Sequence, residues 1–212
     1  MAGKMNEQSL NLKWKVLLIG GHSGAGKTLV AQRLARYYQV GLSEVDDFRL
    51  MLEQITTPEQ LPGLHLPLVA LTDLRLGASE LCQQLITVAT TMSKALEIVI
   101  ANHVSTNTPL ILEGDGLLPA LAAQNIFAGL AVSKQVQAVF IIEADETQLQ
   151  ANMKRRGRGF VQLEAFQQQQ QVQASWLYGQ WLKKEAALHN IAVIAARPWN
   201  TLFERVLSKI LV

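Results

Sequence analysis

A glycine-rich loop near the N-terminus limits the fold of this chain more than any other feature. It follows an apolar run at 15–21 and precedes a helical segment at 28–38. The loop matches the pattern G-x-x-x-x-G-K-[ST] with Gly21, His22, Ser23, Gly24, Ala25, Gly26, Lys27 and Thr28. Such glycines let backbone N–H groups surround an anion, and the start of the helix adds its positive dipole end. The motif therefore predicts a buried strand, a phosphate-binding loop and a helix.

Two side chains of the loop would carry its chemistry. Lys27 is expected to reach the β- and γ-phosphates of a nucleotide, and Thr28 to hold Mg²⁺. The His22 side chain is given no chemical role, although the residue belongs to the nucleotide-binding loop. The alternative is a glycine-rich turn without a ligand, but the strand before it and the helix after it favour phosphate binding.

Apolar runs and helical segments alternate along the rest of the chain. An amphipathic helix is predicted over 81–99, because Leu81, Leu85, Val88, Met92, Leu96 and Val99 follow helical spacing. A second long helix is predicted over 161–188. Strands are predicted at 15–21, 39–47, 108–116, 136–145 and 190–198. This alternation predicts an α/β fold with a parallel sheet covered on both faces and ligands at the carboxyl ends of the strands.

Length and charge exclude several classes of protein. The chain has 212 residues, which supports a single domain over 1–212. Its net charge of +2, without a broad basic region, argues against a nucleic-acid partner. The single cysteine, Cys82, favours a reducing, cytoplasmic setting. Residues 1–15 lack the apolar core of a signal peptide, and Lys94 and Glu97 interrupt the longest apolar stretch, so no membrane span is expected.

Acidic residues end the second and third predicted strands. Of the pair Asp46 and Asp47, one would hold Mg²⁺ through water and the other would orient an acceptor hydroxyl and take its proton. We expect Asp46 on the metal side and Asp47 on the acceptor side, with a helix N-cap as the alternative. Glu113 is the expected Mg²⁺-orienting carboxylate, although Asp is usual there and Asp115 lies two residues on. An ordinary acidic strand end is the alternative for Glu113.

A dense basic cluster follows the fourth predicted strand. Arginines that close over the γ-phosphate stabilise phosphoryl transfer, and Gly157 and Gly159 would permit a mobile lid over about 153–162. A helix C-terminus made basic to complement its dipole is the alternative. The cluster consists of Lys154, Arg155, Arg156 and Arg158.

Together, the P-loop, the acidic pair and the arginine cluster resemble the small P-loop kinases, relatives of adenylate, shikimate and gluconate kinases. Within that group, "DDFR" and "LILEGDGLLP" look like the 2-phosphoglycerate kinase and zeta-toxin-like branch. The resemblance implies ATP and Mg²⁺ as cofactors and a five-stranded parallel sheet in the order 2-3-1-4-5. It also implies that an Asp at the place of Asp47 activates the acceptor, and that Arg155 stacks on adenine. Arg197 and Pro198 resemble the adenine loop, with a plain turn anchored by Trp199 as the alternative.

The acceptor would bind to the insertion at about 50–105. Arg49 and Arg75 flank its first part and are the cations available to an anionic acceptor, although Arg49 could instead be a surface residue. His65 would either contact the acceptor or pack.

We therefore expect an ATP- and Mg²⁺-dependent kinase for a small anionic, hydroxyl-bearing acceptor similar to 2-phosphoglycerate. The alternatives are a zeta-toxin-like nucleotide-sugar kinase, a polynucleotide-end kinase and a P-loop NTPase switch without an acceptor.

Overall fold

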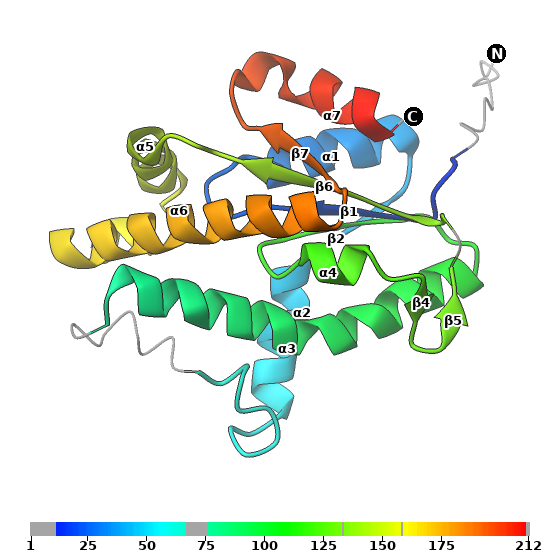
Figure 1. Ribbon diagram of the computed structural model, residues 1–212, viewed down its shortest axis with the longest axis horizontal. Helices are drawn as coiled ribbons and strands as arrows, with labels where there is room; N and C mark the ends of the chain where they lie inside the picture. Colours follow the sequence, from blue (N-terminus) through cyan, green and yellow to red (C-terminus); the bar gives the residue numbers. More distant parts are fainter. Residues whose placement is uncertain (1–11, 67–75, 133, 158, 211–212) are drawn as a thin grey trace, which may run out of the picture.

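A five-stranded parallel sheet runs through the middle of the molecule (Figure 1). The structure is a computed structural model that describes residues 12–66, 76–132, 134–157 and 159–210. Across the sheet the strands are β2 (Gly41–Glu44), β3 (Leu110–Glu113), β1 (Val16–Gly20), β6 (Val136–Ile142) and β7 (Ala192–Ala195). All neighbouring pairs are parallel. Counted in chain order, these five strands lie in the order 2-3-1-4-5, so the predicted α/β architecture is confirmed.

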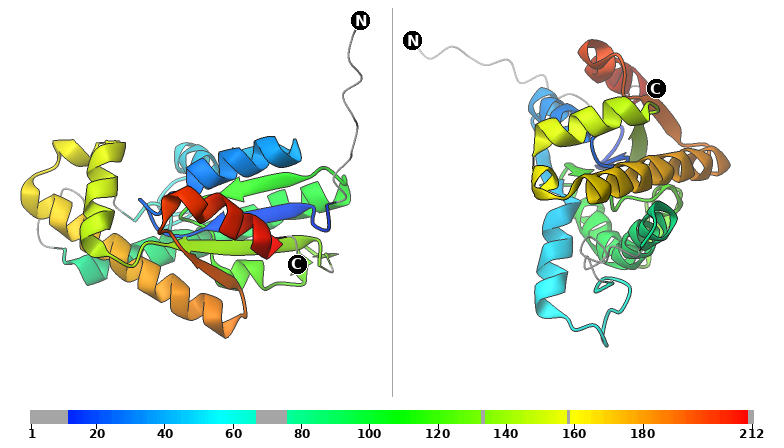
Figure 2. Two further views of the ribbon diagram at one scale, coloured as in Figure 1. Left: turned by 90° about the horizontal axis from the view of Figure 1, so that it is seen from above. Right: turned by 90° about the vertical axis from the view of Figure 1, so that its left-hand side faces the viewer.

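Helices cover both faces of this sheet (Figures 1 and 2). One face carries α1 (Lys27–Tyr38) and α7 (Leu202–Ile210). The opposite face carries α3 (Ala78–Ser105), α4 (Pro119–Ala122) and α6 (Ala165–Leu188).

The remaining elements lie at the two ends of the sheet. Beyond the carboxyl ends of the strands are α2 (Val45–Ile55) and α5 (Glu146–Arg156), and short 3-10 helices form at Phe160–Gln162 and Trp199–Thr201. A small antiparallel hairpin, β4 (Ile126–Phe127) and β5 (Leu130–Ala131), lies at the other end (Figure 1). The sequence patterns did not predict this hairpin.

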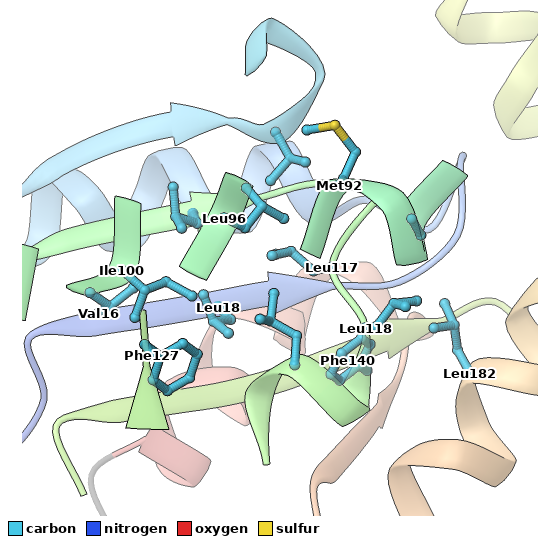
Figure 3. Close-up of a cluster of buried hydrophobic side chains, with 14 of the residues drawn as sticks. Val16, Leu18, Met92, Leu96, Ile100, Leu117, Leu118, Phe127, Phe140 and Leu182 are labelled. Carbon is cyan, nitrogen blue, oxygen red and sulfur yellow. The ribbon is translucent and has the colours of Figure 1, made fainter. Parts of the chain in front are cut away.

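Alternating side chains of the strands build two separate cores. In β1, Leu17 and Ile19 pack toward α1 and α7, whereas Val16 and Leu18 pack toward α3 and α6. All four side chains are fully buried, because a parallel sheet with helices on both faces has no solvated side. Figure 3 shows the second core, where Leu18 lies among side chains of α3 and the neighbouring strands.

The long helix α3 has the composition of a membrane span but packs against the sheet. Among the described helices it is the one that is long and apolar enough to cross a membrane. Its Met92, Leu96 and Ile100 are nevertheless buried in the core (Figure 3). The predicted apolar stripe is therefore only partly a core stripe, because Leu85 is 38% exposed.

Leu96 and Ile98 form a matched pair for testing this core. Leu96 is fully buried, whereas Ile98 is 64% exposed on the same helix. We expect Leu96→Ala to lower the free energy of unfolding by about 2–5 kcal/mol, because it removes buried methyl groups and leaves a cavity. Ile98→Ala should change it by no more than about 0.5 kcal/mol. Urea denaturation of both variants measures the difference, and equal losses would contradict the assignment of α3 to the core.

Candidate active site

The glycine-rich loop lies where the sequence places it, between the carboxyl end of β1 and the start of α1. Its backbone adopts positive φ angles at Gly21, Gly24 and Gly26, which side chains disfavour. A Cβ atom on Gly21 would also lie 2.1 Å from the carbonyl oxygen of Ile141. Because α1 begins at Lys27, the N-terminal N–H groups of this helix lie beside the loop.

Lys27 is buried at the centre of the site. Its Nζ donates a hydrogen bond of 2.9 Å to the carbonyl oxygen of His22 and pairs with the carboxylate of Asp115. The nearer carboxylate oxygen of Glu113 lies 3.9 Å from the same Nζ. The lysine thus connects the loop to two carboxylates at and beyond the end of β3.

Thr28 and Glu113 offer a pair of oxygen ligands that fits Mg²⁺. The Thr28 hydroxyl donates a hydrogen bond of 3.1 Å to Glu113, and burial raises the pKa of the Glu113 carboxyl. Glu44 lies in register with Glu113 on the next strand, and its charge also raises that pKa. The described residues contain no group of three carboxylate, histidine or cysteine side chains that could hold a metal by itself. This suits Mg²⁺, which in such sites takes one or two protein ligands and completes its shell with phosphates and water.

A first cavity, of about 290 Å³, opens beside the loop. We call it the nucleotide cavity. The guanidinium groups of Arg155 and Arg197 each lie 4.7 Å from the Trp199 ring centroid. The indole N–H of Trp199 is buried and has no acceptor among the described residues. The lining of the nucleotide cavity includes Gly24, Gly26, Lys27, Thr28, Arg33, Asn152, Arg155, Arg156, Trp199 and Phe203.

Helix α5 holds the loop against this cavity. Asn152 donates a hydrogen bond of 3.1 Å to the carbonyl oxygen of Gly24, and Arg156 donates one of 3.1 Å to the Ser23 hydroxyl. Arg197, which follows β7, donates a hydrogen bond of 3.0 Å to Glu143 after β6 and one of 2.8 Å to Gln148 of α5. Two of the arginines predicted from the basic cluster, Arg155 and Arg156, therefore meet the loop and the residues after β7.

A second cavity, of about 300 Å³, lies on the other side of the loop between α2, α3 and α6. We call it the acceptor cavity. Its lining includes Ser23 of the loop, Asp46 and Asp115. Asp46 and Asp47 occupy the first turn of α2, but neither is the N-cap, which is Glu44. Asp47 is exposed and does not line the cavity.

Of the other residues predicted on the acceptor side, some line the acceptor cavity and others do not. Arg49 lines the acceptor cavity but pairs with Glu53 at 2.6 Å and lies 3.6 Å from Asp46. This pairing argues against Arg49 as a cation available to an anionic acceptor. His65 bonds to the Thr56 hydroxyl at 2.9 Å, which favours packing over acceptor contact. Pro198 is exposed after β7.

Arg75 and Arg158 lie outside the described residues.

The His22 side chain is completely buried inside the protein. Its Nε2 accepts the backbone N–H of Glu143 at 2.9 Å, so Nδ1 carries the proton and donates to the Ser23 carbonyl at 3.0 Å. The ring packs on Gly179, where a Cβ atom would lie 2.4 Å from His22 Cδ2. Burial lowers the pKa of His22 to about 4. The neutral side chain therefore connects the loop to the residue that follows β6 and to α6.

No protein-family model matches the sequence, and no curated protein matches it significantly. Solved structures do match. A sugar kinase from Janibacter sp. HTCC2649 is 17% identical, with a TM-score of 0.51 over 92% of this chain and 93% of that one. A gluconokinase from Sinorhizobium meliloti 1021 is 14% identical, with a TM-score of 0.53 over 94% and 93%. A deoxyadenosine kinase from M. mycoides is 13% identical, with a TM-score of 0.51 over 93% and 100%.

The chain has the fold of the P-loop small-molecule kinases. Within this fold, the sequence did not predict the contacts of two residues of the candidate site. The sequence offers Asp115 as an alternative to Glu113 and Asp46 for Mg²⁺, whereas in the structure it pairs with Lys27 and lines the acceptor cavity. The sequence offers Trp199 only as the anchor of a plain turn, the alternative to an adenine loop, whereas in the structure it lines the nucleotide cavity and contacts two arginines. In the sequence, the glycines on both sides of Asp115 and the arginine before Pro198 are the features that could have pointed to Asp115 and to Trp199.

His22 makes the stability of this loop depend on pH. Because its folded pKa is about 4, the unfolded chain binds a proton near neutral pH before the folded chain does. Stability from this residue is complete above about pH 6.5 and falls as the pH approaches 4. Between about pH 7 and about pH 4.5, we expect His22 to remove about 2 kcal/mol from the free energy of unfolding.

Urea denaturation across this pH range measures the effect. His22→Gln should lose this part of the pH dependence, whereas His189→Gln, at an exposed helix end, should keep it. A direct titration of the His22 ring by NMR with a midpoint near the ordinary value would contradict the prediction.

Proposed function

We propose that this protein is a kinase that uses ATP and Mg²⁺ to phosphorylate a hydroxyl group of a small molecule. The observation that carries the proposal is the position of Lys27 between the two cavities. The lysine lines the nucleotide cavity, and its Nζ contacts Asp115, which lines the acceptor cavity. A switch that only hydrolyses a nucleotide needs no second cavity beside its phosphate site.

On the nucleotide side, the loop N–H groups and Lys27 would hold the β- and γ-phosphates. Thr28 and Glu113 would hold Mg²⁺, which when bound neutralises charge between these phosphates. Arg156 is bonded to Ser23 of the loop and would stabilise the charge that develops on the γ-phosphate. Trp199, Arg155 and Arg197 would face the nucleoside. The segment at about 153–162 would form a lid that closes over the γ-phosphate.

On the acceptor side, we assign proton removal to Asp46 in place of Asp47. The acceptor insertion at about 50–105 contributes α3 and the second half of α2, and α2 and α3 together form much of the cavity wall. Asp46 lines that cavity from the first turn of α2, whereas Asp47 is exposed. A carboxylate must lie within hydrogen-bond reach of the hydroxyl whose proton it takes, so the lining residue is the better candidate.

Replacing Lys27 tests the proposal. We expect Lys27→Ala to fold but to lower ATP-dependent phosphoryl transfer by about 10²-fold or more, because a charge-stabilising donor at the γ-phosphate is lost. Lys184→Ala, on the exposed face of α6, is the matched control and should keep the parent rate. ADP formation and phosphate transfer are followed with γ-labelled ATP. Parent-like turnover in Lys27→Ala would refute the phosphate-site assignment.

The adjacent pair Asp46 and Asp47 supplies an internal control for the acceptor side. We expect Asp46→Asn to lower kcat by about 10²–10⁴-fold with ATP binding preserved, as for loss of a general base. Asp47→Asn should leave kcat close to that of the parent. The kcat values are measured with γ-labelled ATP, and ATP binding is measured by calorimetric titration. A loss of kcat in Asp47→Asn but not in Asp46→Asn would assign the general base to Asp47.

A further inference from the structure

Most of the surface that lines the acceptor cavity is apolar. Helix α3 contributes Leu81, Leu85, Val88 and Met92, and the segment after α2 contributes Leu64 and Leu66. Leu64 and Met92 are almost completely buried, so the wall continues into the hydrophobic core. Such a surface favours ligand groups that gain from leaving water.

The charged side chains that line this cavity do not suit an anion. Among the described lining residues, Asp46, Glu53 and Asp115 are acidic, and Arg49 is the basic one. The Arg49 guanidinium already contacts both Glu53 and Asp46. Lys27 is paired with Asp115, and Asp46 and Glu53 share the guanidinium of Arg49. A carboxylate or phosphate placed here would therefore meet, among the described residues, only cations that a carboxylate already compensates, and an anion buried without a counter-charge is strongly disfavoured.

One end of the acceptor cavity lies next to the loop and Lys27. Ser23 belongs to the loop, Asp115 pairs with Lys27, and Asp46 follows Val45, which packs on Gly114 and Gly116. A hydroxyl group at this end would lie beside the γ-phosphate site, with the rest of the molecule against the leucines and Met92.

We propose that the acceptor is an uncharged alcohol with an apolar body, and that it binds with its hydroxyl toward Asp46 and Asp115. This inference rests on the proposed kinase function and replaces the anionic acceptor predicted from the sequence. In the reaction, the alcohol oxygen forms a bond to the γ-phosphorus of ATP, and the bond from that phosphorus to the β–γ bridging oxygen breaks. ADP leaves with the electron pair, and Asp46 takes the hydroxyl proton.

A matched pair of acceptors tests the proposal through charge alone. The first is phenyllactate, and the second is the corresponding diol, in which a hydroxymethyl group replaces the carboxylate. Glycerate and 2-phosphoglycerate extend the anionic set, and phenylpropanol extends the neutral set. Binding to the protein loaded with a non-hydrolysable ATP analogue is measured by ligand-observed NMR, and phosphate transfer is measured with γ-labelled ATP.

We expect the diol to bind at least about tenfold more tightly than phenyllactate and to accept the label. Tighter binding or preferred labelling of the anionic compounds would overturn the proposal, as would failure of the neutral compounds to bind. ATP-analogue binding and the Lys27→Ala variant are measured in parallel. If they behave as a phosphate site requires, failure of the neutral compounds refutes the acceptor class alone. If they do not, the proposed kinase function fails.

A variant pair on α3 locates the binding site. Leu85 is partly exposed at the rim of the acceptor cavity, whereas Ile98 is exposed on the same helix and does not line the cavity. We expect Leu85→Glu to weaken binding of the diol by about tenfold or more without changing ATP-analogue binding. Ile98→Glu should bind the diol as the parent does. Equal binding by both variants would show that the diol occupies another place and would overturn the proposal.

Discussion

The buried ammonium group of Lys27 is the interaction on which the rest of the site depends. Removing a cation from water costs several kcal/mol unless close partners compensate it. Here the partners are the carbonyl oxygen of His22, the carboxylate of Asp115 and, at 3.9 Å, Glu113. Satisfying this one charge brings the loop after β1, the start of α1 and the end of β3 to a single point. Both cavities meet at that point.

Uncharged side chains and distant backbone groups also hold the loop in place. The neutral ring of His22 bonds to the backbone of Glu143 and packs on Gly179 of α6. Asn152 of α5 binds the carbonyl oxygen of Gly24. Oriented backbone N–H groups stabilise an anion best when they need no rearrangement on binding. These contacts supply that rigidity, and they come from parts of the chain more than a hundred residues away.

The two cavities differ in chemistry because different helices build them. The nucleotide cavity takes Arg155 and Arg156 from the basic last turn of α5, where positive charge also complements the helix dipole. The acceptor cavity takes much of its wall from α3, which carries apolar side chains on more than the face that packs on the sheet. Leu85 and Val88 line the cavity, whereas Leu96 lies in the core. One helix thus contributes both to the core and to the wall of this cavity.

The sequence by itself determined the sheet, the position of the glycine-rich loop between β1 and α1, and the placement of Thr28 and Glu113, because apolar runs and motif spacing are local features of the chain. Only the tertiary structure decided which aspartate faces the acceptor cavity. Successive side chains on a helix point about 100° apart, so the packing of α2 in the folded protein decides that Asp46, and not Asp47, faces the cavity. The pairing of Arg49 with Glu53, by contrast, is an i,i+4 contact within α2 and follows from the spacing of these residues once the segment is helical. The contacts of Asp115 with Lys27 and of Trp199 with Arg155 join distant segments, and no local pattern carries such pairings.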